Sequence, residues 1–118
     1  DGYLNISGRS KDLIISGGLN VYPAEVEKIV DTLEGIAEST IIGLPHDDFG
    51  EGVTAVVVFK NDFHFDEAAL RKLIGNKLAS FKVPMRIIIR ESLPKNAMGK
   101  IQKNLLREEY NNLYIKNQ

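Results

Sequence analysis

The 118-residue sequence contains no cysteine, which excludes disulfides, thiolate metal ligands and a cysteine nucleophile. This absence fits a reducing compartment, and we expect a cytoplasmic protein. The longest unbroken apolar run, residues 55–59, is far shorter than the ~20 residues needed to cross a bilayer, so no transmembrane segment is predicted. The start of the chain has neither a signal-peptide pattern nor a methionine, and we expect a piece of a longer polypeptide.

The sequence also lacks a large net charge of either sign. The balance of 15 basic and 16 acidic residues gives no electrostatic reason to expect nucleic acid or an anionic membrane as a partner. The signs are nevertheless unevenly distributed, because residues 1–51 hold three basic and ten acidic residues and residues 52–118 hold twelve and six. The densest basic stretch contains Lys95, Lys100, Lys103 and Arg107. It indicates either a solvated helix face or an anion-binding site.

Hydrophobic periodicity predicts an α/β or α+β domain. We expect strands at residues 3–7, 13–16, 39–44, 53–59 and 85–89, and helices from Pro23 to about Gly35, from the N-cap Asp66 to about Leu78, and from Ile101 to Tyr114. The first two strands read as a β-hairpin, and Gly17-Gly18 is expected to end the second. The later strands predict a small, mostly three-stranded sheet flanked by helices, in which Leu70, Leu73 and Ile74 are buried.

Several familiar sites are excluded by the residues present. His46 and His64 lie in different loops without partners at metal spacing, so each is expected to be a surface residue and no metal site is predicted. Residues 94–101 have the length of a Walker phosphate loop, but Pro94 replaces its first glycine and Ile101 replaces its hydroxyl residue. The sequence also shows no Ser-His-Asp triad or paired catalytic carboxylates.

Charged residues beside glycines remain as candidates. Gly99-Lys100 would let an ammonium reach a phosphate or carboxylate, and Gly8-Arg9 would place a guanidinium on a hairpin loop. Gly17-Gly18 would allow close approach of a ligand to the backbone. Taken alone, each pattern is equally compatible with turn glycines beside solvated charges.

Two longer motifs carry a resemblance to a known family. Residues 2–3 and 8–27 closely resemble the strand, hinge and loop motif of adenylate-forming enzymes, which include acyl-CoA synthetases, peptide-synthetase adenylation domains and luciferases. Residues 94–103 resemble the loop that bears the catalytic lysine of the same family. The resemblance covers essentially the whole chain, and it concerns the small C-terminal domain. Residues 45–52 and 100–110 are most similar to the malonyl-CoA synthetase branch.

This resemblance implies a domain organisation and a reaction. Residues 1–118 would form the mobile C-terminal domain, with a hinge-side hairpin at 1–18 and an α/β lid at 19–118. The large N-terminal domain, with the ATP phosphate loop and the acyl pocket, lies outside this sequence, so the chain alone is expected to be inactive. The full enzyme would be a ligase converting a carboxylic acid, Mg²⁺·ATP and CoA to acyl-CoA, AMP and pyrophosphate through an acyl-adenylate. Malonate and a fatty acid are the suggested acids.

The resemblance also implies roles for individual residues. Lys100 is implied to be the catalytic residue and Arg9 to contact the nucleotide. Lys11 is implied to be the hinge, where many relatives carry aspartate. Contact with CoA or its pantetheine arm is implied for Gly17, Gly18 and Lys82. Some CoA ligases place basic residues on both sides of the proline at position 84. Here those positions are Val83 and Met85, so Lys82 alone is carried over as a CoA contact.

Partners follow from the same resemblance. The N-terminal domain of the same polypeptide is the expected macromolecular partner, and the spacing from Pro94 to Gly99-Lys100 resembles the pattern that protein acetyltransferases recognise in bacterial acyl-CoA synthetases. Two other functions remain open: a stand-alone nucleotide- or RNA-binding α/β module, and an assembly domain. An RNA-binding sheet would need exposed aromatic residues, and residues 53–58 contain none.

Overall fold

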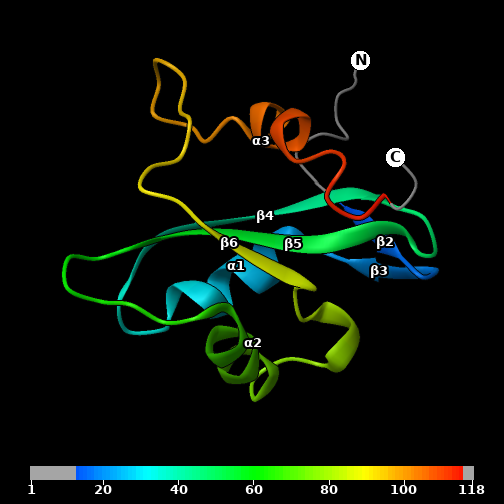
Figure 1. Ribbon diagram of the computed structural model, residues 1–118, viewed down its shortest axis with the longest axis horizontal. Coiled ribbons are helices and arrows are strands. Elements are labelled where there is room, and N and C mark those ends of the chain that lie inside the picture. Colours follow the sequence, from blue (N-terminus) through cyan, green and yellow to red (C-terminus); the bar gives the residue numbers. More distant parts are fainter. Residues whose placement is uncertain (1–12, 116–118) are drawn as a thin grey trace.

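The computed structural model describes residues 13–115, which form one mixed sheet with helices on both faces (Figure 1). The elements are β2 (Ile14–Ser16), β3 (Leu19–Val21), α1 (Pro23–Asp31), β4 (Ile36–His46), β5 (Gly50–Phe59), α2 (Glu67–Gly75), the 3₁₀ turn η2 (Ser80–Lys82), β6 (Arg86–Ile89) and α3 (Lys103–Glu109). This confirms the predicted mixed fold of a sheet flanked by helices. The strand expected at 3–7 and the loop at 8–12 lie outside the described residues.

Strand β5 is the centre of the sheet. On one side β4 pairs antiparallel with it over its whole length, from Ile36 opposite Phe59 to His46 opposite Gly50. On the other side β6 pairs parallel with residues 54–57, and β2 joins the beginning of β5 where Ser16 faces Gly50. The predicted three-stranded sheet is therefore present as β4, β5 and β6, and the β2–β3 hairpin extends it.

The sheet separates two hydrophobic clusters, because its central strands are apolar on both faces. One cluster joins β4 and β5 to α1 and α2 and includes Ile41 and Val30. The other joins the same strands to α3 through Ile42 and Leu106. In Figure 1, α1 and α2 lie below the sheet and α3 lies above it. Since helices cover both faces, the sheet offers no open platform on which RNA bases would stack.

Gly17-Gly18 end strand β2, as the sequence predicts, but they are followed by a further strand that the sequence did not predict. These residues form a tight turn between β2 and β3, so residues 19–21 are a strand rather than the approach to a helix. The φ angles of Gly17 and Gly18 are +60° and +82°. A two-residue hairpin loop of this twist requires positive φ at both positions, which glycine adopts without strain.

Other predicted boundaries also change. The loop expected at residues 45–52 shrinks to Asp47–Phe49, because pairing between β4 and β5 continues to His46 and Gly50. The last helix is shorter than expected and ends at Glu109. Asp66 is confirmed as the N-cap of α2, since its carboxylate accepts a bond of 2.7 Å from the backbone N–H of Ala69. Leu73 was expected to be buried but is 38% exposed. The buried face of α2 consists of Leu70 and Ile74.

Candidate functional site

The loop that carries Lys100 is a closed turn between β6 and α3. The side-chain oxygen of Asn96 accepts hydrogen bonds from the backbone N–H groups of Met98, at 2.9 Å, and Lys100, at 3.0 Å. The backbone N–H of Asn96 donates to the carbonyl of Lys100 at 2.9 Å. Gly99 has a φ of +84°, which a residue with a side chain rarely adopts. The backbone of Lys100 is therefore fixed, while its side chain is exposed.

Both ends of this loop are anchored by ion pairs. Lys95 contacts Glu38 of β4 at 2.7 Å, and Lys103 contacts Glu27 of α1 at 3.0 Å. Within residues 13–115, the Lys100 ammonium makes neither a hydrogen bond nor an ion pair. Lys95 and Lys103 of the basic stretch thus hold the loop through ion pairs, whereas the Lys100 ammonium has no partner within residues 13–115.

Glu27 links the loop to the rest of the domain. Its carboxylate also accepts hydrogen bonds from the backbone N–H of Ile41 at 2.9 Å and from the Thr40 hydroxyl at 3.3 Å. Because β4 is an edge strand of the sheet formed by residues 13–115, the Ile41 N–H bonds to this carboxylate and not to a further strand. Helix α1, the edge of β4 and the start of α3 therefore form one connected support for Lys100.

A second feature is an apolar groove beside the β2–β3 turn. It has a volume of about 360 Å³ and is lined by Ser16, Gly17, Leu19, Phe49, Val53, Ser80, Phe81, Val83 and Met85. The groove brings Gly17 together with η2 and the residues after it, more than sixty positions away in the sequence. The backbone N–H of Gly17 donates to the carbonyl of Phe49 at 2.9 Å, which fixes the turn against the groove wall.

Lys82 lies in the chain between two residues that line this groove, Phe81 and Val83, and it is already paired. Its ammonium contacts Glu25 of α1 at 2.8 Å and lies 5.6 Å from the centre of the Phe81 ring. An incoming phosphate would have to compete with the Glu25 carboxylate for it. Lys82 as a CoA contact therefore remains a prediction, and in this structure the side chain joins α1 to η2.

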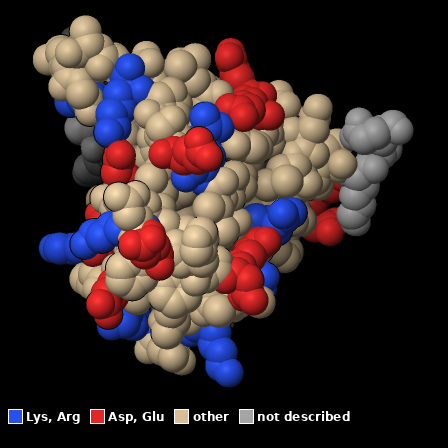
Figure 2. Space-filling view, turned by 60° about the vertical axis from the view of Figure 1, so that its left-hand side comes forward, with Lys and Arg blue, Asp and Glu red and all other residues tan. Residues whose placement is uncertain are grey.

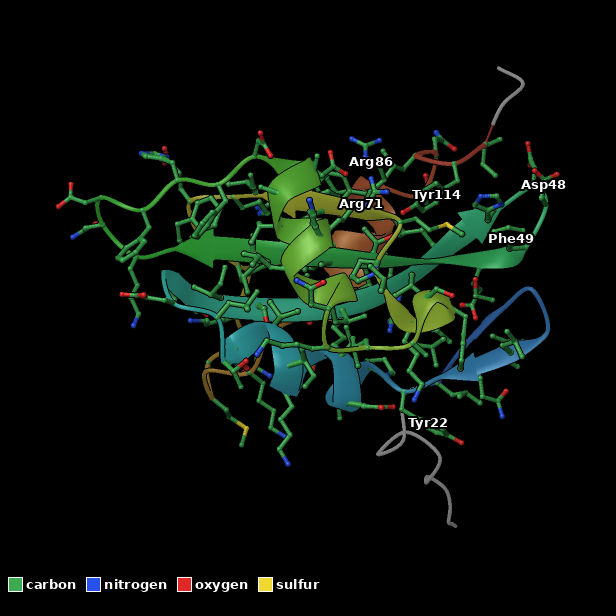
Figure 3. All side chains as sticks on the ribbon, turned by 90° about the horizontal axis from the view of Figure 1, so that it is seen from below. Tyr22, Asp48, Phe49, Arg71, Arg86 and Tyr114 are labelled. Carbon is green, nitrogen blue, oxygen red and sulfur yellow. The ribbon has the colours of Figure 1, made fainter. Side chains whose placement is uncertain are left out.

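The sequence reasoning missed an aromatic cluster at the tip of the β4–β5 turn. His46, expected only as a surface residue, stacks on Phe49 with ring centres 4.7 Å apart and lies 5.1 Å from the ring of Tyr114. Figure 3 shows Asp48 and Phe49 at this end of the molecule. Burial raises the pKa of the Tyr114 hydroxyl, more than its bond to Thr54 lowers it. The sequence does show aromatic rings at positions 46, 49 and 114, but no local pattern indicates that they pack together in the fold.

The two features lie at opposite ends of the domain. In Figure 1 the loop between β6 and α3, in orange, is at the upper left, and the β2–β3 hairpin is at the right. Figure 2 shows basic and acidic side chains interspersed on the face that it presents. Gly18 belongs to the hairpin turn with Gly17, whereas Arg9 and Lys11 lie outside the described residues. The structure thus separates Lys100 from the glycine turn and brings the turn to η2.

Residues 13–115 contain no group of three or more His, Asp or Glu side chains placed to hold a metal ion. The same residues form no helix with the length and apolar character needed to cross a membrane.

Sequence comparison places these features in a known family. The profile of the AMP-binding enzyme C-terminal domain matches residues 25–100, and the chain belongs to this family. Among curated relatives, the long-chain-fatty-acid–CoA ligase FadD13 of Mycobacterium tuberculosis is 43% identical over 110 residues, covering 93% of this chain and 22% of the ligase. The 2-succinylbenzoate–CoA ligase of Listeria monocytogenes is 44% identical over 110 residues, covering 93% of this chain and 23% of that enzyme.

Solved structures agree with the sequence relatives. ATP-bound MatB from Rhodopseudomonas palustris is 50% identical and superposes with a TM-score of 0.85 over 89% of this chain and 21% of its own. Apo MatB from the same organism is 52% identical, with a TM-score of 0.86 over 96% of this chain and 23% of its own. The chain therefore spans between a fifth and a quarter of the length of these proteins.

Proposed function

We propose that this chain is the mobile C-terminal domain of an AMP-forming acid–CoA ligase. The observation that carries the proposal is the Lys100 ammonium, held on a closed turn with both flanking lysines paired and with no partner of its own within residues 13–115. The family match and the CoA ligases among its relatives support the same assignment.

In the first half-reaction Lys100 would act on developing negative charge. An oxygen of the substrate carboxylate attacks the α-phosphorus of ATP, the bond to the bridging oxygen breaks, and pyrophosphate leaves. A fixed cation beside the carboxylate and the α-phosphate positions the nucleophile and stabilises charge in the transition state. The anchored loop suits this task, because little has to reorganise when charge develops.

In the second half-reaction the opposite end of the domain would be used. The CoA thiolate attacks the acyl carbonyl of the adenylate, and AMP leaves. The lining of the groove beside Gly17 is mostly apolar, which suits the thiol-bearing arm of CoA, and Lys82, between the lining residues Phe81 and Val83, is the candidate for a phosphate contact. Since Lys100 and the groove lie far apart, the domain would turn between the two steps, with Lys11 as the hinge and Arg9 contacting the nucleotide.

The proposal extends to the acid substrate, the binding of ATP and Mg²⁺, and the cellular location. A fatty acid is favoured by the name of FadD13, and malonate by the resemblance of residues 45–52 and 100–110 to the malonyl-CoA synthetase branch. ATP would be bound mainly by the preceding domain, and so would Mg²⁺, because residues 13–115 offer no cluster of metal ligands. We expect the enzyme to work in the cytoplasm.

The proposal is tested with the full-length polypeptide. It would be incubated with ATP, Mg²⁺ and CoA and a panel of dicarboxylic and fatty acids, and AMP, pyrophosphate and acyl-CoA would be quantified by chromatography. We expect one acid class to give AMP and acyl-CoA in equal amounts. Formation of ADP in place of AMP, or no product with any acid on the panel, would contradict the proposal.

Regulation by acetylation of Lys100 is a further part of the proposal. The exposed ammonium on a fixed turn is accessible to a protein acetyltransferase, whereas Lys95 and Lys103 are engaged by carboxylates. Acetylation would remove the positive charge and stop adenylation. Incubation of the full-length protein with an acetyltransferase and acetyl-CoA, followed by mass spectrometry, should show modification at Lys100 and loss of pyrophosphate release. Acetylated Lys100 with intact adenylation would refute this.

A further inference from the structure

Phe49 is a large apolar side chain that the structure holds in an exposed position. It is 45% exposed and forms one wall of the groove beside Gly17. A phenylalanine at the tip of a turn would ordinarily sample several rotamers, because few neighbours restrict it. Here the backbone on both sides of the ring is bonded, since its carbonyl accepts from Gly17 and its N–H donates to His46. The backbone that carries this wall is therefore held on both sides of the ring.

His46 supplies two kinds of contact to this wall. Its Nδ1 accepts hydrogen bonds from the backbone N–H groups of Asp48, at 3.0 Å, and Phe49, at 3.2 Å. Nδ1 must therefore be unprotonated, and in the neutral ring the proton is on Nε2. The imidazole also lies nearly parallel to the Phe49 ring, with an angle of 10° between the planes. One side chain thus sets both the backbone of the turn and the orientation of the exposed ring.

Tyr114 supports His46 from the segment that follows α3. The backbone at Tyr114 forms a parallel bridge with His46, and the two rings lie 5.1 Å apart. The Thr54 hydroxyl donates to the carbonyl of Gly52, so the Tyr114 hydroxyl, 2.8 Å away, donates to Thr54. Gly52 leaves the space that the Tyr114 ring fills, because a Cβ atom at this position would lie 2.7 Å from the ring.

We infer that His46 is a positioning residue for thioester formation, which fixes Phe49 as the wall along which the thiol-bearing arm of CoA is guided. Tyr114 carries this support from the C-terminal segment, so the groove depends on residues that follow the Lys100 loop. The inference rests on the proposed function, and it gives a structural role to the residues at 46, 49 and 114, to which the resemblance assigned none.

Two complementary substitutions in the full-length enzyme test the inference. His46→Phe keeps an aromatic ring but removes the acceptor, whereas His46→Asn keeps an oxygen that accepts from the N–H groups two and three residues ahead. We expect His46→Phe to lower kcat/KM for CoA about ten-fold through a higher KM, with the adenylation rate changed less than about two-fold. His46→Asn should recover most of the loss.

Three results would overturn the inference. The first is an unchanged KM for CoA in His46→Phe. The second is an equal loss in both half-reactions of His46→Phe, which would indicate a merely structural role. The third is a His46→Asn enzyme that is as impaired as His46→Phe. A wild-type enzyme that forms no acyl-adenylate would instead overturn the proposed function. Hydrogen exchange separates the two cases, because the amides of Asp48 and Phe49 should exchange faster in His46→Phe whatever the enzyme catalyses.

The contribution of Tyr114 is tested through Gly52. Gly52→Ala would push the ring away from His46, whereas Tyr114→Phe keeps the ring and removes only its bond to Thr54. We expect Gly52→Ala to raise the KM for CoA as His46→Phe does, and Tyr114→Phe to stay within about two-fold of wild type. A Gly52→Ala enzyme with a wild-type KM for CoA would remove Tyr114 from the inference.

Discussion

Lys100→Ala should reduce acyl-adenylate formation by roughly 10²–10³-fold while leaving thioester formation from supplied adenylate intact, as expected when one preorganised group that stabilises developing charge is removed. The reason is positional. Asn96 and Gly99 fix the backbone of the turn, and under the proposed function the ammonium would act only in the step in which this end of the domain faces the substrate. The measurement is pyrophosphate release in the first half-reaction and acyl-CoA formation from synthetic adenylate in the second.

Lys95→Ala is the matched control for this experiment. It removes a lysine from the same loop, but one whose ammonium contacts Glu38 at 2.7 Å on the protein surface. Exposed ion pairs of this kind contribute about 0–1 kcal/mol to stability, so the substitution should leave most of the adenylation rate in place. Equal damage to both half-reactions by Lys100→Ala, or an equal loss of adenylation in Lys95→Ala, would show that Lys100 has no special role.

Gly17→Val should produce the opposite pattern, with thioester formation lowered by at least about ten-fold and adenylation nearly preserved. The Cβ at position 17 would come 3.9 Å from the Phe49 ring, so a branched side chain would extend over the groove. The φ of +60° adds strain for any residue with a branched Cβ. Comparison of kcat/KM for CoA with the pyrophosphate-release rate measures the effect, and a thermal melt shows whether the domain is still folded.

Gly18→Asn is the control for Gly17→Val. A Cβ at position 18 meets nothing within 4 Å, and asparagine tolerates a φ near the observed +82° better than other residues do. This variant should keep most of the thioester activity because it leaves the groove open. If Gly17→Val slows adenylation as much as thioester formation, or if both variants behave alike, the groove is not the path of the thiol.

The sequence by itself determined the elements whose signals are local. The N-cap at Asp66, the apolar stripe of α1 and the continuous apolar run of β5 each follow from residues within a few positions of one another. Lys100 and Gly17-Gly18 were singled out by the resemblance of two continuous segments to the adenylate-forming family, because the glycine patterns alone are equally compatible with ordinary turns. The boundaries failed where pairing between strands outweighed local preference, as at residues 19–21 and 45–52.

Which side chains contact one another around Lys100 and around the groove was decided only by the tertiary structure. Among the lysines that the structure describes in the basic stretch, Lys95 and Lys103 are paired because Glu38 of β4 and Glu27 of α1 lie beside them. Lys82 reaches Glu25 across a separation of 57 residues, and Thr54 reaches Tyr114 across 60. Hydrogen bonds, ion pairs and ring contacts act over a few ångströms in space and carry no periodic pattern along the chain. The sequence therefore pointed to Lys100 and to Gly17-Gly18 as candidates, whereas the anchored loop and the groove form only when distant segments pack together.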